Sequence, residues 1–429
     1  MGQVRRLRQI RQLTVSSALN MKLAIIGGGA AGLFAGGMCA KNGVQTDIYD
    51  KNTLFGKKLR ITGKGRCNVT NNCTRDEFFS NIITNPKFLY SAYSAFDCND
   101  TMQFFEQLGV PLKTERGNRV FPVSDSAHDI ANALVDNCRK SGARLITKRV
   151  TDIKSCDGIF TVSYDGGTAE YDKVLIATGG ASYRGTGSTG DGYAFARSLG
   201  HTVTEIKPSL VPLVCRERVC AEMMGLSLKN IELKVVDTQN GKTVYRQFGE
   251  MLFTHFGVSG PVVLSASSAI RQMEKGRYKL YIDLKPALDE SELDKRLISD
   301  FGKNLNKNFS NSLGALLPQK MIEPVIRLSG IDPHKKVNEI TKQQRRELLS
   351  LLKAFPLTVD GFSDINDAII TSGGVSVKEI NQKTMCSKLI AGLYFAGEVI
   401  DCDGFTGGFN LQIAFSTAYA AASSIIQDI

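Results

Sequence analysis

Residues 22–50 constrain the fold of this chain more than any other segment. The apolar run 22–27 (KLAIIG) is typical of a buried parallel strand, and it leads into Gly27-Gly28-Gly29-Ala30-Ala31-Gly32, which fits the pattern G-x-G-x-x-G. The Ala- and Leu-rich residues 30–41 predict a helix that Gly43 closes, and residues 46–50 (TDIYD) predict a second strand. A strand–helix–strand unit of this length indicates a Rossmann-type α/β domain.

The fingerprint predicts a bound dinucleotide, with a separate role for each position. Gly27 allows the tight turn, Gly29 lets backbone N–H groups approach a pyrophosphate, and Gly32 lets the helix pack closely on the strand. Asp50 ends the second strand 18 residues after Gly32, where its carboxylate can accept hydrogen bonds from the ribose hydroxyls. The neighbouring positions Ala31 and Lys51 belong to the same predicted site.

Two distant segments favour FAD over NAD as that dinucleotide. Residues 173–180 (KVLIATGG) predict a strand that ends beside the dinucleotide, with Thr178 and Gly179 in contact with it. Residues 393–412 (LYFAGEVIDCDGFTGGFNLQ) predict a strand followed by a glycine-rich helix start, where Glu398 can bind the ribitol and N–H groups can face the flavin. An ordinary glycine turn before a helix is the alternative. The predicted cofactor contacts in this C-terminal segment are Gly397, Glu398, Gly408, Asn410, Leu411, Gln412 and Ile413.

The middle of the chain reads as an insertion between two halves of one α/β domain. Residues 226–247 and 277–284 alternate apolar and polar side chains like antiparallel strands, whereas residues 291–351 are Lys-rich with leucines at helical spacing. We therefore expect an extension at 1–20, a first FAD-binding part at 21–205, a β-rich insert at 206–287, a helical insert at 288–360 and a second FAD-binding part at 361–429. Within the first part, the Asp165-Gly166-Gly167 turn predicts a hairpin between strands at 160–164 and 173–178.

Composition excludes several other classes of protein. No apolar run approaches the roughly 18–20 residues that cross a bilayer, so we expect a soluble cytoplasmic protein with no membrane partner. The ten cysteines form no CxxC pair and no metal-ligand spacing, which predicts free thiols and no metal site. Residues 1–20 carry four arginines and no acidic residue. They are expected to lie outside the fold. Either the start codon is placed too early, or these residues are a transit peptide.

The net charge of +11 favours polyanionic partners or anionic ligands. A basic surface that serves solubility alone is the other interpretation. The oligomeric state is not predicted.

Five segments resemble a known family. They are 56–71 (GKKLRITGKGRCNVTN), 119–124 (RVFPVS), 249–261 (GEMLFTHFGVSGP), 371–377 (TSGGVSV) and 383–412. The chain resembles the bacterial FAD-binding proteins labelled aminoacetone-oxidase-like or BaiN-like, whose members are linked to saturating carbon–carbon double bonds in steroids and in a ribosomal RNA uridine. One departure is Asp50, which stands where a Glu is usual and keeps the carboxylate.

The resemblance implies a discontinuous Rossmann-type FAD-binding domain with an inserted β-barrel-like part and a small helical part. It also implies that a Gly- and Lys-rich loop lies along the FAD, and such a loop suits an anion-binding nest. The residues concerned are Lys58, Gly63, Gly65, Arg66 and Asn68.

FAD would transfer the hydride or electrons, and the protein would supply or remove a proton. Candidate proton donors are Cys67, His255, Tyr183 and Glu398. Lys64 and Arg66 flank Cys67 and are expected to lower its pKa, while a small buried side chain is the alternative. His255 lies in a Gly-rich turn of the insert and could instead be structural. Because only one fingerprint is present, NAD(P)H would act as a transient electron donor, or electrons come from elsewhere.

Three classes of function remain open from the sequence. The leading class is a flavin reductase of an activated C=C bond, and the charge and the Lys-rich insert favour a ribosomal RNA base over a steroid-like small molecule. The second class is a flavin oxidase of a small amine such as aminoacetone. The third is a non-enzymatic RNA-binding or assembly factor that FAD stabilises.

Overall fold

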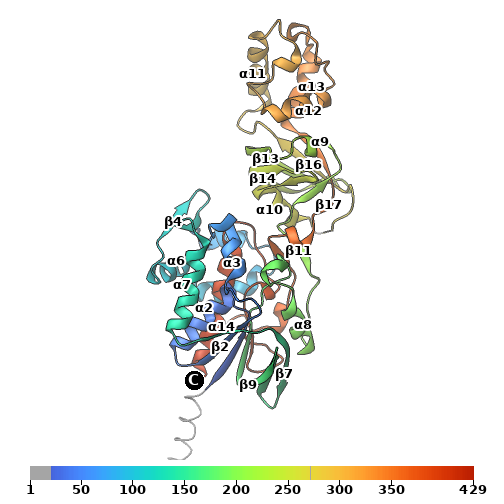
Figure 1. Cartoon of the computed structure of the whole chain (residues 1–429). Coiled ribbons are helices and arrows are strands. Elements are labelled where there is room, and N and C mark those ends of the chain that lie inside the picture. Colours follow the sequence, from blue (N-terminus) through green and yellow to red (C-terminus); the bar gives the residue numbers. More distant parts are fainter. Residues whose placement is uncertain (1–20, 271) are drawn as a thin grey trace, which may run out of the picture. The chain divides into compact units, whose positions relative to one another are not determined.

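The computed structural model describes residues 21–270 and 272–429, so the extension 1–20 lies outside the described residues. The chain divides into two compact units (Figure 1). Unit 1 contains the described residues up to Pro208 together with Ile369–Ile429, and unit 2 is Ser209–Ala368. The sequence places the two crossings after residues 205 and 360. The return crossing lies later in the structure because strand β17 (Phe355–Phe362) belongs to a barrel in unit 2.

Unit 1 is built on a five-stranded parallel sheet. The strand order is β19 (Leu393–Phe395), β10 (Lys173–Ile176), β1 (Lys22–Ile26), β2 (Gln45–Asp50) and β6 (Arg144–Thr147). Leu23, Ala24 and Ile25 are fully buried, as expected for a strand covered on both faces. The sheet extends from β1 towards β2 on one side and β10 on the other. Ligands of open α/β sheets bind at such a switch point, beyond the carboxyl ends of the strands.

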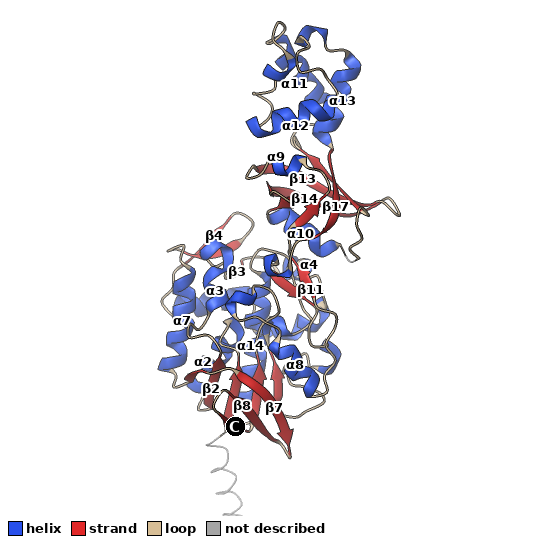
Figure 2. Ribbon diagram, turned by 45° about the vertical axis from the view of Figure 1, so that its right-hand side comes forward, coloured by secondary structure: helices blue, strands red, loops and turns tan. Residues whose placement is uncertain are grey.

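The first and last long helices of unit 1 pack against each other. Helix α2 (Ala30–Lys41) contacts α14 (Phe409–Gln427) and also α7 (Ala127–Lys140), and Figure 2 shows the three helices around the parallel sheet. Glycines in α2 allow this close packing, since a Cβ on Gly37 would lie 2.4 Å from the side-chain nitrogen of Asn137. The C-terminal segment thus completes the domain that the N-terminus begins.

Two small antiparallel sheets complete unit 1. The first is β7 (Val150–Cys156), β8 (Ile159–Tyr164) and β9 (Gly167–Tyr171). The turn at Asp165-Gly166 does form a hairpin, but the expected partner strand is wrong: β8 pairs with β9, while β10 joins the parallel sheet beside β1. Strand β9 was not predicted because Gly167–Tyr171 (GTAEY) has little apolar character. The second sheet has the order β3 (Thr70–Asn71), β5 (Arg119–Pro122) and β4 (Leu112–Glu115).

The remaining helices of unit 1 are short. They are α3 (Lys57–Ile61), α4 (Arg75–Ser80), α5 (Tyr90–Ala95), α6 (Cys98–Gln107) and α8 (Asp191–Ser198). Strands β11 (Lys207–Ser209) and β18 (Ile370–Ser372) pair where the chain leaves and re-enters this unit.

Unit 2 contains the expected inserted barrel and helical part. The barrel closes in the order β12 (Leu213–Cys215), β15 (Gly257–Ser259), β14 (Lys242–Phe253), β13 (Ser227–Asp237), β16 (Tyr278–Asp283) and β17. Two helices, α9 (Val219–Glu222) and α10 (Pro261–Ala269), accompany it, and α11 (Glu290–Gly302), α12 (Gln319–Ser329) and α13 (Lys342–Lys353) form the helical part. Capping boxes at Asp289 and Thr341 start α11 and α13. The predicted fold class, a discontinuous Rossmann-type domain with both inserts, is confirmed. Among the described helices, none combines the length and the apolar character needed to span a bilayer.

Candidate functional site

The glycine-rich turn between β1 and α2 has a different spatial reason at each glycine. Gly27 has φ +113°, and a Cβ there would lie 2.4 Å from the carbonyl oxygen of Ala177. A Cβ on Gly32 would lie 1.9 Å from the carbonyl oxygen of Gly27, so glycine is needed where α2 meets the end of β1. A Cβ on Gly29, by contrast, would have no atom within 4 Å. The turn therefore leaves open space at the N-terminus of α2, where a pyrophosphate is expected.

Asp50, the expected ribose ligand, lies beside this turn at the end of β2. Its Oδ2 accepts the backbone N–H of Gly28 at 2.9 Å, and its Oδ1 accepts the backbone and side-chain N–H groups of Asn52 at 2.7 and 2.9 Å. These bonds fix the carboxylate next to the open space. Each oxygen of a carboxylate has two acceptor positions, so the predicted ribose hydrogen bonds are compatible with this arrangement.

Residues 62–68 form a tightly curled loop, in which Gly63, Lys64, Gly65 and Cys67 all have positive φ. Backbones of this kind can point N–H groups into a concave anion-binding nest. The next residue, Asn68, carries a buried Oδ1 that accepts no hydrogen bond from the described residues. An unsatisfied buried amide oxygen costs about 1–3 kcal/mol, so this atom is suited to a donor on a bound group.

Lys58 and Glu398, two predicted cofactor contacts 340 residues apart, meet in an ion pair. The Lys58 ammonium lies 2.8 Å from Glu398 Oε2 and donates to Ser182 Oγ at 2.9 Å. Glu398 Oε1 accepts the backbone N–H of Thr371 at 2.8 Å. A Cβ on Gly180 would lie 2.7 Å from this same oxygen, which explains the second glycine after Thr178. The loop after β10, helix α3 and the segment after β19 thus converge on one polar centre.

Gly397 joins this centre to the glycine-rich turn. A Cβ on Gly397 would lie 3.1 Å from the Cβ of Ala31, in the first turn of α2. Gly179, with φ +74°, lies against Ser188 in the loop that follows β10. The predicted contacts Ala31, Gly179 and Gly397 therefore lie around one end of the parallel sheet.

The N-terminus of α14 provides free N–H donors but fewer than the sequence suggests. Gly408 precedes the helix with φ +100°, and no side chain of the described residues caps it. The N–H of Gln412 already donates to Gly408 O at 3.1 Å, so the unpaired donors belong to the first turn, which includes Asn410 and Leu411. The side chain of Asn410 binds Gly404 and holds the preceding loop. This helix start suits a partially negative ligand group.

The Gln412 side chain is structural. It is fully buried, accepts the hydroxyls of Thr70 at 2.6 Å and Thr101 at 2.8 Å, and donates to Phe96 O and Ser416 Oγ. Ile413 is buried as well. Both side chains therefore support the first turn of α14 from the protein interior.

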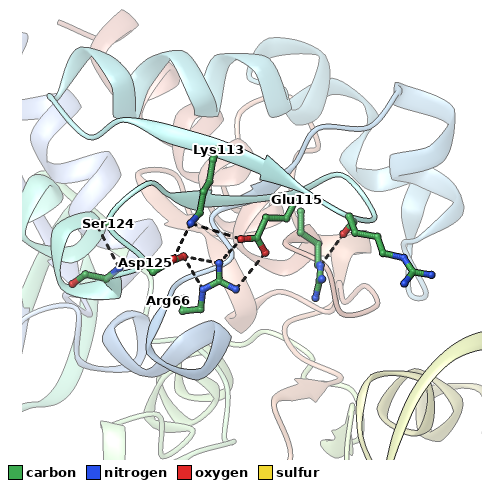
Figure 3. A network of polar contacts seen from close by, with 8 residues as sticks. Arg66, Lys113, Glu115, Ser124 and Asp125 are labelled. Atoms are coloured by element: carbon green, nitrogen blue, oxygen red, sulfur yellow. Dashed lines mark hydrogen bonds and ion pairs between the residues drawn. The ribbon is translucent and has the colours of Figure 1, made fainter. Parts of the chain in front are cut away.

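Two predicted contacts are engaged in ion pairs with other parts of the protein. Arg66 lies between Glu115 and Asp125, with Lys113 on the far side of the same carboxylates (Figure 3). Its guanidinium also lies 4.2 Å from the ring centre of Phe121. Lys51 pairs with Asp191 at 2.8 Å. For both residues, contact with a cofactor stays a prediction.

Cys67 is unsuited to the acid role that the sequence allowed. Its side chain is fully buried, and burial raises the pKa of the thiol to about 12. The expectation that Lys64 and Arg66 lower this pKa is wrong, because the thiol points inward while Lys64 is exposed and Arg66 pairs with acidic residues. The geometry favours the alternative interpretation of a small buried side chain.

Of the other acid candidates, Glu398 is held in its ion pair with Lys58, while His255 and Tyr183 are accessible. His255 is exposed in the short turn between β14 and β15, where its ring contacts Phe256 edge-on at 4.9 Å. It belongs to unit 2, so its place relative to the cofactor residues of unit 1 stays a prediction. Tyr183 is partly exposed and follows Ser182, a partner of Lys58. Its φ of +53° is unusual for an aromatic residue, and such strain often marks a functional site.

Several residues that hold this centre together were not predicted from the sequence. Asn52 holds Asp50, while Ser182 and Thr371 hold Lys58 and Glu398. Thr371 lies in TSGGVSV and Ser182 directly follows IATGGA, so both motifs carried a signal, but their partners lie far away in sequence. Within the described residues, no group of three or more His, Cys, Asp or Glu side chains is placed to hold a metal ion.

Known proteins resemble this chain over most of its length. The family model described as HI0933-like protein Rossmann domain matches residues 21–424. A 3-dehydro-bile acid delta(4,6)-reductase of Clostridium scindens is 31% identical over 93% of this chain and 98% of its own length. The ribosomal RNA dihydrouridine synthases of Escherichia coli and Haemophilus influenzae are 31% and 33% identical, each over 94% of this chain and 97% of their own length. The chain therefore belongs to the HI0933-like Rossmann family and is a flavin-dependent oxidoreductase.

Proposed function

We propose that this protein is an FAD-dependent reductase that saturates a carbon–carbon double bond conjugated to a carbonyl, and that its substrate is a uridine in ribosomal RNA. The observation that carries the proposal is that relatives of about equal similarity are named for reduction of such a bond in two different molecules. What these relatives have in common is the type of reaction, and it is this reaction that we assign here.

The predicted cofactor residues of unit 1 fit FAD. The open space at Gly29, the carboxylate of Asp50 and the unsatisfied Asn68 Oδ1 are consistent with a pyrophosphate, a ribose and a further donor. The first turn of α14 offers N–H groups to the electron-rich edge of a flavin. When bound, FAD would supply the hydride for the reduction.

The chain itself must position the cofactor and deliver a proton. The Lys58–Glu398 pair places one cation and one anion at the convergence of three segments, which can orient polar groups of the cofactor. For the proton we favour Tyr183, because a phenol keeps its proton at neutral pH and can donate it to a carbon that becomes negative. His255 is the alternative donor.

The distribution of charge favours an RNA substrate over a small apolar one. Residues 303–346 contain nine Lys and Arg residues against three Asp and Glu residues. Within this stretch, residues 305–309 and 335–338 run antiparallel, joined by Val337 N–H to Lys307 O at 3.1 Å and Phe309 N–H to Lys335 O at 2.8 Å. The lysines of these two runs, together with Lys303 just before the first run, are named the basic edge: Lys303, Lys307, Lys335 and Lys336.

The basic edge is suited to phosphates. None of its four ammonium groups forms an ion pair with an acidic side chain of the described residues, although Lys336 donates to Asn308 Oδ1 at 2.9 Å. Lysines without acidic partners, alternating with asparagines, can bind an RNA backbone independently of its sequence. Binding of a bile-acid-like substrate would not require such a basic surface.

The test is reduction of defined acceptors by the purified FAD-loaded protein without oxygen. NADH and NADPH are mixed separately with the enzyme, and bleaching of the flavin absorbance shows which one reduces it. The reduced enzyme then meets ribosomal RNA that lacks dihydrouridine, or an unsaturated 3-oxo bile acid, and the products are identified by mass spectrometry. Dihydrouridine in the RNA supports the proposal.

Other products point to other functions. Reduction of the bile acid alone would replace the RNA substrate by a small molecule, which the similarity to the C. scindens reductase makes the second candidate. Peroxide formed on adding aminoacetone in air, with neither acceptor reduced, would assign an oxidase. If no acceptor is reduced and no amine is oxidised, the proposal of a C=C reductase is wrong.

A further inference from the structure

The hairpin between β4 and β5 is tied directly to the start of α14. The side-chain nitrogen of Asn71, in β3, donates to Gly117 O in the hairpin turn at 3.1 Å and to Gly407 O at 2.9 Å. A Cβ on Gly408 would lie 2.3 Å from the carbonyl oxygen of Thr70, so glycine lets β3 and the helix start touch. The turn of the hairpin is therefore held beside the N-terminus of α14, which is expected to face the flavin.

This hairpin carries two arginines on its surface. Arg116 lies in the turn and Arg119 begins β5, and both are exposed. The Nε of Arg119 donates to Arg116 O at 3.0 Å, which holds this side chain across the turn. The carboxylates of Glu115 and Asp125 both pair with Arg66 instead (Figure 3). The guanidinium groups of the hairpin are thus available to a bound anion.

A third arginine lies next to an exposed tyrosine at the start of α4. The backbone N–H of Asn72, which follows β3, donates to Asn118 O in the hairpin turn at 2.7 Å, and α4 then begins with Arg75. The guanidinium carbon of Arg75 lies 5.6 Å from the ring centre of Tyr90. Tyr90 is 41% exposed and packs edge-on against Phe79, with ring centres 4.4 Å apart. An exposed aromatic ring beside a cation is suited to stacking with a nucleobase.

Helix α4 also lies against the segment that leads into α14. The backbone N–H of Phe405 donates at 2.9 Å to the carbonyl oxygen of Asn81, directly after α4. The ring of Phe78, in α4, lies 5.9 Å from the ring of Phe409, the first residue of α14. The hairpin turn and α4 are therefore both neighbours of the same helix start.

We propose that a surface beside the flavin binds the unpaired RNA on either side of the uridine that is reduced. This arginine surface consists of Arg75, Arg116, Arg119 and Tyr90. None of its three guanidinium groups forms an ion pair with an acidic side chain in the part of the chain that the structure describes. Its role rests on the proposed function, since it assigns the contacts that hold the RNA substrate at that site.

The chemistry of the reaction explains why the RNA must be unpaired here. A uridine inside a duplex cannot present its C5=C6 bond to a flavin, so an enzyme that acts on a base extrudes that base or uses a single strand. The phosphates of the neighbouring nucleotides then run past the site, where arginines can bind them. A neighbouring base that is unstacked in the same way can lie on the ring of Tyr90.

The test measures binding of a short single-stranded RNA with one central uridine to the FAD-loaded, full-length protein by fluorescence anisotropy. Changing both Arg116 and Arg119 to Gln should raise the Kd at least about tenfold and lower the slope of log affinity against log salt by about 0.7 for each lost phosphate contact. Tyr90→Leu should raise the Kd about 5- to 150-fold and leave the slope unchanged, because stacking involves no phosphate.

Two controls separate these contacts from a general loss of positive charge. Arg197→Gln removes another exposed arginine of unit 1, on α8, which packs against β7, so the Kd and the slope should stay as in the wild type. An RNA with uncharged methylphosphonate linkages on both sides of the uridine should bind the wild-type protein more weakly. Changing Arg116 and Arg119 should then weaken binding little further, because the phosphates they contact are already neutral.

The possible outcomes separate the arginine surface from the proposed reaction. The surface is rejected if the wild type binds this RNA but the variants match Arg197→Gln in Kd and slope, which leaves the proposed reductase intact. It is also rejected if the arginine changes leave RNA binding unaltered and instead raise the NADH or NADPH concentration needed for half-maximal flavin reduction. RNA that binds as expected but is never reduced would overturn the proposed function and keep the surface, and no binding by the wild type would overturn both.

Discussion

Replacing Gly29 by alanine should weaken cofactor binding while leaving the protein without cofactor as stable as before. The Cβ of alanine would meet no atom within 4 Å, and Gly29 has φ −87° and ψ −163°, which alanine adopts without strain. Loss of unfolded-state entropy should stabilise by about 0.4–1 kcal/mol. Alanine is a poorer N-cap than glycine by a similar amount, about 0.5–1 kcal/mol. The two effects offset each other.

The effect of Gly29→Ala on FAD binding should be larger than its effect on stability. The added methyl group occupies the space through which a pyrophosphate oxygen would approach the backbone N–H groups of the turn. Loss of one hydrogen bond to a charged group costs about 1.5–3 kcal/mol, which is a roughly 10- to 150-fold rise in the Kd of FAD. Titration of flavin-free protein with FAD, followed by quenching of flavin fluorescence, measures this change.

Gly32→Ala is the matched control at the other glycine of the fingerprint. Its Cβ would lie 1.9 Å from the carbonyl oxygen of Gly27, so the backbone must shift even without cofactor. Overpacking of this kind costs about 1–3 kcal/mol, which lowers the melting temperature of a unit this size by several degrees. If Gly29→Ala lowers the melting temperature of flavin-free protein as much as Gly32→Ala does, or binds FAD normally, the assignment of the open space to the cofactor is wrong.

Two further predictions address catalysis and substrate. Tyr183→Phe should slow substrate reduction by about 10²–10⁴ while flavin reduction stays normal, whereas His255→Asn should leave both steps close to wild type. The reverse result in rapid-mixing kinetics would assign the role of proton donor to His255. Changing Lys307 and Lys336 to Gln should reduce the slope of log affinity against log salt for RNA by about 0.7 per lost phosphate contact. Lys229→Gln, on the exposed face of barrel strand β13, should not change the slope, and equal effects at both places would reject the basic edge as an RNA surface.

Features of the fold that depend on local sequence were predictable. The strand, turn and helix at residues 22–41 are encoded by an apolar run, a glycine pattern and an Ala-rich stretch, all within one short segment. The barrel strands β13 and β16 alternate visibly because one face is buried, whereas β14 is buried only near its end. Strands β9 and β17 were missed because GTAEY is polar and FPLTVDGF adjoins a long helical stretch.

The candidate site was predictable as a set of motifs, but not as a set of contacts. Lys58 and Glu398 were each assigned to the cofactor, yet nothing local indicates that they pair with each other across 340 residues. The raised pKa of Cys67 could not be predicted either. Basic neighbours in sequence lower the pKa of a thiol only when they are near in space and the thiol is hydrated. Burial is set by tertiary packing, and here it outweighed the flanking charges.

The contact between Lys58 and Glu398 can form reliably although unit 2 is inserted between them. The entropy of closing a loop grows only slowly with its length, about 0.6 kcal/mol for each doubling, so inserting unit 2 between the halves of unit 1 costs little. The cost falls further because unit 2 has its own buried core, and because β11 and β18 bring the two crossings together within one small sheet. The parallel strand β19 and helix α14 can therefore return to β10 and α2 with a fixed register. Glu398 follows β19 directly, so the register that places this strand also brings its carboxylate to Lys58.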